Sequence, residues 1–373
     1  MGKQQAEKTI RDLLAIAEIT VNGNQPFDIQ VQDDRIYSRL LAQGSLGLGE
    51  SYMDGWWDCD QLDEFINRIL RADLPSHIKA NFSTIWNVIR ARIFNLQSKR
   101  RAYQVGERHY DIGNDLYEAM LDKRMNYTCG YWKDAETLDQ AQENKLELVC
   151  RKIGLQPGMT VLEFGCGFGS FAGYAAEKYD ARVTGVTVSK KQVEWANSAY
   201  SHLPVDIRLE DYRNVGGRFD RVISIGVMEH VGYKNYRTYM EMTDRTLKPD
   251  GLAFFHTIGA NLSNAIADPW TVKYIFPNGS LPSIAQLAEA MEGLFIVEDW
   301  HSFGPHYDRT LLAWYKNFNN AWPELKKNYD ERFYRMWRYY LLSSAGGFRS
   351  RYNQLWQVVM NRPWKDQPEC RFS

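Results

Sequence analysis

A glycine-rich stretch in the first half of the chain limits its possible folds more than any other feature. The apolar run from Met159 to Phe164 carries the β-branched and large side chains of a buried strand. Gly165, Gly167 and Gly169 follow at alternate positions, and apolar residues then recur at helical spacing. A strand, a tight glycine turn and a helix predict a nucleotide-type site, because glycines let a ligand approach the backbone closely.

The spacing of the glycines indicates which kind of nucleotide to expect. A dinucleotide fingerprint reads G-x-G-x-x-G, but Ser170 stands three positions after Gly167. The form E-x-G-x-G-x-G, which begins here at Glu163, is typical of S-adenosylmethionine-dependent methyltransferases. An ordinary glycine turn of an α/β fold is the alternative interpretation.

Composition narrows the class of protein. With 373 residues, the chain is long enough for a large domain and a small one, and its net charge of −1 does not favour a nucleic-acid partner. Five cysteines without a C-x-x-C pair predict neither a disulfide framework nor a metal site, so we expect a reduced, cytoplasmic protein. Aromatic residues make up 14% of the chain, which fits either a greasy ligand cavity or a Trp-rich core. No apolar run is long enough to span a membrane.

Three parts follow from the patterning. Residues 1–75 hold short elements and are expected to form a small N-terminal domain. Residues 76–101 are expected to form an amphipathic linker helix and a basic segment, and residues 102–373 are expected to form a catalytic domain around the glycine turn. Within that domain, the segments at about 260–290 and 310–347 exceed ordinary connectors and are expected to be lid-like insertions.

The linker helix allows two interpretations. Its apolar stripe lies beside basic residues, as in a helix that contacts a membrane surface. The same stripe could instead pack on the neighbouring domain, with the basic residues solvated. The stripe and the basic cluster consist of Ile78, Phe82, Ile85, Trp86, Ile89 and Ile93, and of Lys99, Arg100 and Arg101.

Alternating strands and helices after the glycine turn predict an α/β fold. We expect a Rossmann-like class I methyltransferase sheet, mostly parallel and with helices on both faces, next to a small N-terminal α+β or helical domain. Lys248–Gly251 is expected to be a turn. The strands after the first are expected at 182–188, 205–209, 219–225, 252–258, 295–300 and 355–360.

Ligands of such a sheet bind beyond the carboxyl ends of the strands. That rule selects Gly165, Gly167, Thr187 with Gln192, Glu210, Asp211, Tyr212, Glu229, His230, His256 and Thr257. Glu229 and His256 should end neighbouring strands, where they could hold a small acid or move a proton. The position of Thr187 is not acidic, which disfavours both a dehydrogenase and a generic methyltransferase. Cys129, a lone cysteine, reads as a buried small hydrophobe.

Eight strings distributed along the chain carry a family resemblance. They are GSLGLGESYMDGWW (44–57), HYDIGNDLY (109–117), YTCGYW (127–132), LEFGCGFG (162–169), MEHVG (228–232), HTIG (256–259), KYIFPNGSLPS (273–283) and QLWQVV (354–359). In this order they resemble the bacterial cyclopropane-fatty-acyl-phospholipid synthases. The resemblance covers nearly all of the chain.

This resemblance implies an activity and a base. A methylene group would pass from S-adenosylmethionine to the cis double bond of an unsaturated acyl chain in a membrane phospholipid. The resulting carbocation would lose a proton to a bound bicarbonate, and a cyclopropane ring would close. The residues implied at the bicarbonate are Cys129, Glu229, His256, the backbone of Ile258 and Tyr307.

The resemblance also implies cofactor contacts and partners. Contacts to S-adenosylmethionine are implied for Tyr127, Thr128, Gly165, Gly167, Thr187, Gln192, Asp211 and Tyr212. Ser344 stands where relatives often have a cysteine once assigned to the active site, so no covalent role is expected there. A homodimer and peripheral association with the inner face of the membrane are implied as well. The alternatives are a related lipid C-methyltransferase giving a methyl-branched or methylene product, and a non-catalytic lipid-binding protein.

Overall fold

The computed structural model describes residues 3–74, 113–263 and 267–372. These residues fall into two compact units. The sheet unit comprises the described residues within Asn95–Asn264, Asn278–His306 and Gln354–Ser373, and the helical unit those within Met1–Phe94, Ala265–Pro277 and Tyr307–Asn353. The linker helix predicted at 76–101, its basic residues, and the boundaries at 75 and 102 lie outside the described residues.

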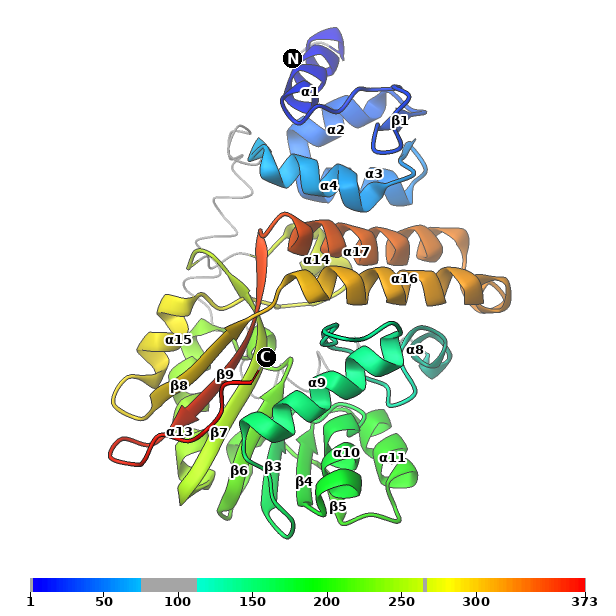
Figure 1. Ribbon diagram of the computed structural model, residues 1–373. Helices are drawn as coiled ribbons and strands as arrows, with labels where there is room; N and C mark the ends of the chain where they lie inside the picture. Colours follow the sequence, from blue (N-terminus) through cyan, green and yellow to red (C-terminus); the bar gives the residue numbers. More distant parts are fainter. Residues whose placement is uncertain (1–2, 75–112, 264–266, 373) are drawn as a thin grey trace. The chain divides into compact units, whose positions relative to one another are not determined.

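A seven-stranded sheet forms the centre of the sheet unit (Figure 1). Neighbouring strands from β5 to β7 run parallel, whereas β8 pairs with β9 in the antiparallel sense. The predicted mostly parallel α/β sheet is therefore confirmed. From one edge to the other the strands are β5 (Val205–Leu209), β4 (Arg182–Thr187), β3 (Thr160–Phe164), β6 (Phe219–Ile225), β7 (Leu247–Ala260), β9 (Asn353–Asn361) and β8 (Ile296–Ser302).

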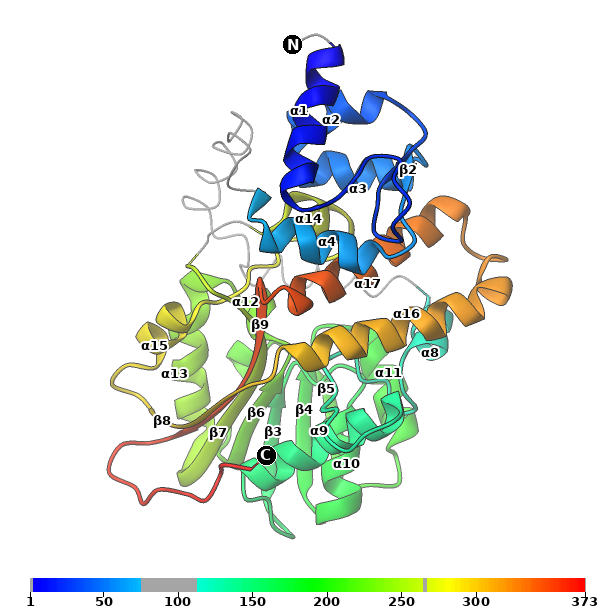
Figure 2. The ribbon, with the colours of Figure 1, turned by 45° about the horizontal axis from the view of Figure 1, so that its top comes forward.

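Side chains of the strands alternate between two apolar cores, one on each face. Val161 and Ile223 point into a core with α9 (Leu138–Lys152), α10 (Ser170–Tyr179) and α11 (Lys190–Ala199). Leu162 and Val222 point into the opposite core with α13 (Tyr236–Thr246) and α15 (Ile284–Met291). The two helix layers are visible in Figure 1 and Figure 2. Because both faces are covered there, the inner strands β3 and β6 carry apolar side chains in succession.

Lys248–Gly251 was expected to be a turn, and this expectation was wrong. The segment belongs to β7, which begins at Leu247. The register shifts there, since Phe219 pairs with Leu247 but Arg221 already pairs with Leu252. A bulge-like irregularity of the ladder holds the extra residues of β7, and the strand continues through it.

The helical unit is assembled from segments that are far apart in the sequence. Helix α17 lies against α3 and α4, and α14 lies against α3. The segment 310–347, expected as an insertion of the catalytic domain, therefore packs with N-terminal helices. The elements are α1 (Lys3–Ile16), β1 (Gln30–Val31), α2 (Arg35–Gln43), α3 (Ser45–Met53), β2 (Trp57–Asp58), α4 (Leu62–Arg71), α14 (Pro269–Tyr274), α16 (Pro305–Leu325) and α17 (Glu331–Arg349).

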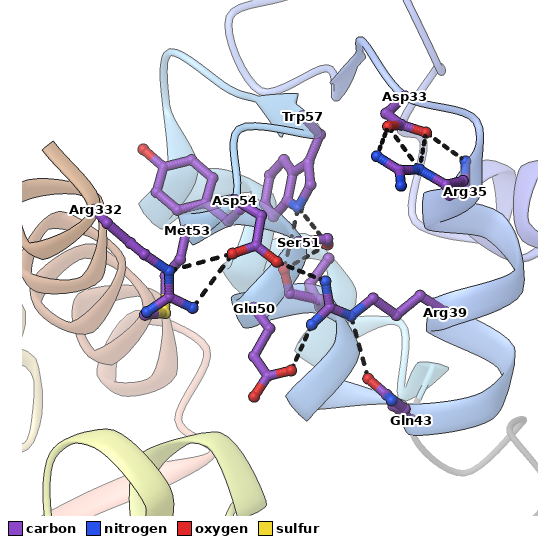
Figure 3. Close-up of polar contacts among 12 residues, drawn as sticks. Asp33, Arg35, Arg39, Gln43, Glu50, Ser51, Met53, Asp54, Trp57 and Arg332 are labelled. Carbon is purple, nitrogen blue, oxygen red and sulfur yellow. Dashed lines mark hydrogen bonds and ion pairs between the residues drawn. The ribbon is translucent and has the colours of Figure 1, made fainter.

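Ion pairs connect these segments (Figure 3). Arg39 of α2 pairs with Glu50 and Asp54 of the α3 region, and Asp54 also pairs with Arg332 of α17. Glu50 is buried and also accepts hydrogen bonds from Lys273 and Tyr274 of α14. The string 44–57 is thus mostly a helix, and this helix holds three other elements of its unit.

Two further findings concern the chain as a whole. Among the described residues no helix is both long and apolar enough to cross a bilayer. All five cysteines are buried.

Candidate active site

The glycine turn follows β3 and has the backbone conformation that its residues suggest. Gly165, Gly167 and Gly169 have φ angles of 65°, 55° and 73°, in the left-handed region that side chains disfavour. A Cβ at Gly165 would lie 2.4 Å from the side chain of Val227, whereas one at Gly167 would meet nothing within 4 Å. The turn therefore presents bare backbone to open space at the carboxyl end of the central strand.

The ends of β4 and β5 place further predicted cofactor residues at the same edge of the sheet. Thr187 and Gln192 are buried, and their side-chain oxygens Oγ1 and Oε1 are joined by a hydrogen bond of 2.8 Å. Asp211 is buried and forms a 2.6 Å ion pair with Arg213. The ring of Tyr212 lies 5.6 Å from that of Phe164, the last residue of β3. Parallel strands bring these positions together because their carboxyl ends meet at one edge.

The segment from Asn126 to Gly130 carries the predicted residues Tyr127, Thr128 and Cys129. Tyr127 packs edge to face on Tyr117 at 5.3 Å. Cys129 is fully buried, and its thiol lies 3.2 Å from the carbonyl oxygen of Gly130. A Cβ at Gly226, just after β6, would fall 2.8 Å from the methyl group of Thr128. Glycine at 226 thus lets this segment lie against the end of β6.

Glu229 and Ile258 come together at the ends of β6 and β7. The backbone N–H of Ile258 donates to Oε1 of Glu229 at 2.6 Å, while Oε2 is buried without a hydrogen-bond partner. Burial raises the pKa of Glu229 to about 7, although the bond from Ile258 opposes the shift. The N–H of Ile258 is thus engaged by Glu229, and its direct contact with an anion stays a prediction.

His256 stands on β7, two residues before Ile258, and is 1% exposed. Burial, with smaller effects from the charges of Lys145 and Lys152, lowers the pKa of His256 well below its usual value. The neutral ring has its Nδ1 3.4 Å from Nε2 of Gln357. With the amide donating to Nδ1, the ring proton sits on Nε2, which is buried and has no partner.

Tyr307 and Ser344 belong to the helical unit. Tyr307 lies in the first turn of α16, where it stacks on Phe348 at 4.6 Å and packs edge to face on Trp314. Ser344 is half-buried within α17. Their roles stay predictions.

Two buried polar residues of α9 contact the predicted site and were not identified from the sequence. Gln142 donates from Nε2 to the carbonyl oxygen of Thr128 at 2.8 Å. Lys145 donates from Nζ to the hydroxyl of Thr128 at 2.8 Å and to Oδ1 of Asn126 at 2.9 Å. The sequence could have indicated them, because both residues lie on the face of the predicted helix that also carries Ala141 and Val149.

Glu163, which helped to identify the glycine motif, is also buried beneath the site. It is 3% exposed, and its Oε2 has no hydrogen-bond partner. Burial raises the pKa of Glu163 to about 8, although the charge of Lys145 and a bond from the backbone of Ala172 oppose the shift.

Comparison with known proteins identifies the family of this architecture. The family described as mycolic acid cyclopropane synthetase matches residues 97–358. Cyclopropane-fatty-acyl-phospholipid synthase of Escherichia coli strain K12 is 52% identical over 351 residues, which are 94% of this chain and 92% of that protein.

Two solved structures agree in fold. The cyclopropane synthase MmaA2 of Mycobacterium tuberculosis is 28% identical with a TM-score of 0.65, and the match covers 72% of this chain and 99% of that one. The mycolic acid cyclopropane synthase CmaA1, solved with SAH and CTAB, is 32% identical with a TM-score of 0.64, covering 69% and 97%. The predicted class I methyltransferase fold is confirmed. The resemblance of the eight strings to the cyclopropane-fatty-acyl-phospholipid synthases is confirmed, and the chain belongs to the mycolic acid cyclopropane synthetase family of S-adenosylmethionine-dependent methyltransferases.

Proposed function

We propose that this protein transfers a methylene group from S-adenosylmethionine to the cis double bond of unsaturated acyl chains in membrane phospholipids and forms a cyclopropane ring. Identity of 52% over nearly the whole chain to a phospholipid synthase supports this substrate class. A bound bicarbonate is the proposed base, and the geometry around Glu229 and His256 supports that choice.

The residues at the strand ends fit S-adenosylmethionine, whose sulfonium supplies the electrophilic methyl carbon. Open space in front of Gly167 and the positive φ angles of the turn suit a ligand that lies on the backbone. The related CmaA1 was solved with SAH. The proposed contacts are Tyr127, Thr128, Gly165, Gly167, Thr187, Gln192, Asp211 and Tyr212.

The observation that carries the proposed base is a pair of unpartnered polar atoms. Oε2 of Glu229 and Nε2 of His256 are both buried without partners, at the ends of the adjacent strands β6 and β7. Buried polar atoms are usually hydrogen-bonded, so such a pair indicates a ligand. Bicarbonate, when bound, supplies an oxygen base that removes a proton.

The protonation states of these residues suit an anion. With its pKa raised to about 7, Glu229 can keep a proton on Oε2 and donate it to an anion oxygen. Neutral His256 can donate from Nε2. The thiol of Cys129, the backbone of Ile258 and Tyr307 complete the proposed set.

The acceptor places further demands on the site. An alkene is a poor nucleophile, so its approach to the methyl carbon has to be enforced by positioning in a dry site. Faces of aromatic rings can stabilise the positive charge that methyl transfer leaves on the acyl chain.

This scheme requires no covalent intermediate at Ser344. A homodimer and peripheral binding to the inner membrane face, through the segment 76–101, are proposed from the family resemblance.

The test is a product analysis. Purified protein is incubated with S-adenosylmethionine and vesicles of a cis-monounsaturated phospholipid, and the acyl chains are examined by mass spectrometry and proton NMR. We expect a gain of CH₂ with upfield ring-proton signals, and sedimentation of the protein with anionic vesicles.

Other products would contradict the proposal. A saturated methyl branch carries additional hydrogen and would show a methyltransferase that stops before ring closure. An exocyclic methylene adds the same CH₂ and would be distinguished by vinylic proton signals. Absence of any product, with S-adenosylmethionine bound, would show that the acceptor is wrong.

A further inference from the structure

Lys145 is a buried basic residue to which the proposed reaction assigns no role. It lies in the middle of α9 and is 1% exposed. Its ammonium donates to two neutral oxygens, Oδ1 of Asn126 and Oγ1 of Thr128. Burial of a charge is costly unless the charge is compensated, so the position requires an explanation.

The acidic groups that face Lys145 are engaged elsewhere or lack a full charge. Asp122 accepts hydrogen bonds from the backbone and side-chain nitrogens of Asn126 and from the backbone of Arg124. Glu163 interacts with Lys145 through its charge, but its raised pKa of about 8 keeps it largely protonated at neutral pH. Burial lowers the pKa of Lys145 itself to about 8, although Asp122, Cys129 and Glu163 oppose the shift. Of these groups, Asp122 favours the ammonium form of Lys145 most.

Another buried lysine of the same helix shows the ordinary structural solution. Lys152 is fully buried and forms an ion pair with Asp299, which is also buried. Seven residues separate Lys145 and Lys152, and that spacing places both on the same face of α9. Lys152 has a carboxylate as its partner, whereas Lys145 holds the segment that carries the predicted site residues.

Lys145 holds the segment that carries Cys129, a residue of the predicted anion site. The segment from Asn126 to Gly130 is fixed on α9 by Lys145, by Gln142 and by the close approach of Gly130 to Ala141. The charge of Lys145 interacts with Cys129 and, together with the smaller effect of Lys152, with His256. An anion held by Cys129, Glu229 and His256 would therefore lie within the field of this ammonium.

We propose that Lys145 is a positioning residue of the reaction, which fixes Thr128 and Cys129 through its hydrogen bonds and favours a bound anion through its charge. The inference rests on the proposed function and deepens it, because the proposed anion-binding set includes no other cation. Lys145 does not touch the substrate in this scheme and acts through its neighbours.

Two substitutions test the inference. Lys145→Gln keeps a hydrogen-bonding group and removes the charge, and Lys145→Met removes both. The matched control is Lys152→Met combined with Asp299→Asn, which removes the other buried charge of α9 without leaving a carboxylate alone. Folding of each variant is checked by circular dichroism and thermal unfolding.

The main readout does not depend on turnover. ¹³C-labelled bicarbonate is titrated against each protein and followed by ¹³C NMR, and SAH binding is measured by calorimetry. Both Lys145 variants are expected to weaken bicarbonate binding by roughly tenfold or more, since a nearby buried charge is lost. SAH affinity should fall less for Lys145→Gln than for Lys145→Met, and the control should bind both ligands as the unsubstituted protein does. In assays of ring formation the half-saturating bicarbonate concentration should rise in parallel.

Other outcomes would contradict either the role of Lys145 or the proposed bicarbonate base. If the unsubstituted protein binds bicarbonate and the Lys145 variants bind it equally well, the inference on Lys145 is wrong and the proposed base stands. If the unsubstituted protein binds no bicarbonate, the proposed base itself is wrong. Failure of both Lys145 variants to fold, when the control folds, would make Lys145 a structural residue and overturn the inference.

Discussion

At the scale of single residues, the unusual feature of Glu229 is a carboxyl group with one satisfied oxygen and one unsatisfied one. The fold tolerates this because the group can take up a proton, and its pKa is raised from 4.5 to about 7. Between these values the unfolded chain binds fewer protons than the folded chain. The contribution of the Glu229 carboxyl group to the free energy of unfolding is therefore fully present below pH 4.5 and is lost as the pH rises through 7.

Glu229→Gln should remove this pH dependence. Urea unfolding of both proteins at pH 5 and pH 8, without ligands, gives the comparison. Between pH 5 and pH 8 the free energy of unfolding of the unsubstituted protein should fall by roughly 2 kcal/mol more than that of the variant. Only the unsubstituted protein has a carboxyl group at position 229 that must ionise while buried. Other titrating groups are common to both proteins and cancel.

Asp220→Asn provides a control of opposite sign. Burial opposes the shift, but hydrogen bonds from Lys248 and Thr160 lower the pKa of Asp220 to about 2. Both test pH values lie above its folded and unfolded pKa, so this variant should lose equal stability at each. Parallel pH curves for the Glu229→Gln variant and the unsubstituted protein would contradict the assignment of a buried, protonated Glu229.

The site could be predicted from the sequence only in part, and the reason is geometric. Gly165 and Glu229 follow predicted strands, and Thr187 and His256 lie in the last part of predicted strands. The rule that parallel strands bind ligands at their carboxyl ends selects these residues without a structure. Lys145 belongs to a helix, where a buried polar side chain is invisible until the helix is placed on its sheet. Tyr307 and Ser344 were assigned by resemblance alone.

At the scale of elements, α3 shows why some structure was missed. The residues of Ser45–Met53 include Gly47 and Gly49, which lower helix propensity, and no helix was expected there. The structure explains both glycines by close approach. A Cβ at Gly47 would lie 2.7 Å from the carbonyl oxygen of Arg39, and one at Gly49 would lie 2.4 Å from the ring of Trp270. Packing between elements overrides local propensity here.

Gly49→Ala is therefore expected to destabilise the protein even though alanine favours helices. Trp270 is 1% exposed, donates its indole N–H to the sulfur of Met53 and packs on Tyr339 at 4.6 Å, so it has little room to move. Overpacking should outweigh the propensity gain and leave a net loss on the order of 1–2 kcal/mol in urea unfolding. Gly216→Ala, where a Cβ would meet nothing within 4 Å, should change stability by less than about 0.5 kcal/mol. Equal stability of the two variants would show that Trp270 can move.

Elements with a strong apolar pattern were predicted well. The strands β5 and β6 have the bounds that were expected, and β3 begins one residue later than expected. The bulge of β7 was mistaken for a turn because proline and glycine mark both. Contacts between distant segments, such as α17 with α3 and α4, leave no local trace in the sequence.

At the scale of the whole molecule, the helical unit depends on segments from both halves of the chain. Arg335 of α17 donates to the carbonyl oxygens of Tyr52 and Trp57 and pairs with Asp58. A Cβ at Gly346, on the same helix, would lie 2.4 Å from the carbonyl oxygen of Asp63. Such close backbone contact indicates that α17 and the N-terminal helices are shaped for each other.

Removal of residues 1–74 should therefore affect the two units differently. The truncated protein is expected to bind a hydrophobic dye more strongly and to lose the stability of its remaining helical segments, because the face of α17 that carries Arg335, Tyr339 and Gly346 loses its cover. The sheet unit should still bind SAH. In support, the family model matches residues 97–358 and does not include the removed segment. Dye binding, thermal unfolding and calorimetric titration with SAH are compared with those of the full chain. Unchanged dye binding would mean that α17 does not need the N-terminal helices, and loss of SAH binding would mean that the sheet unit does.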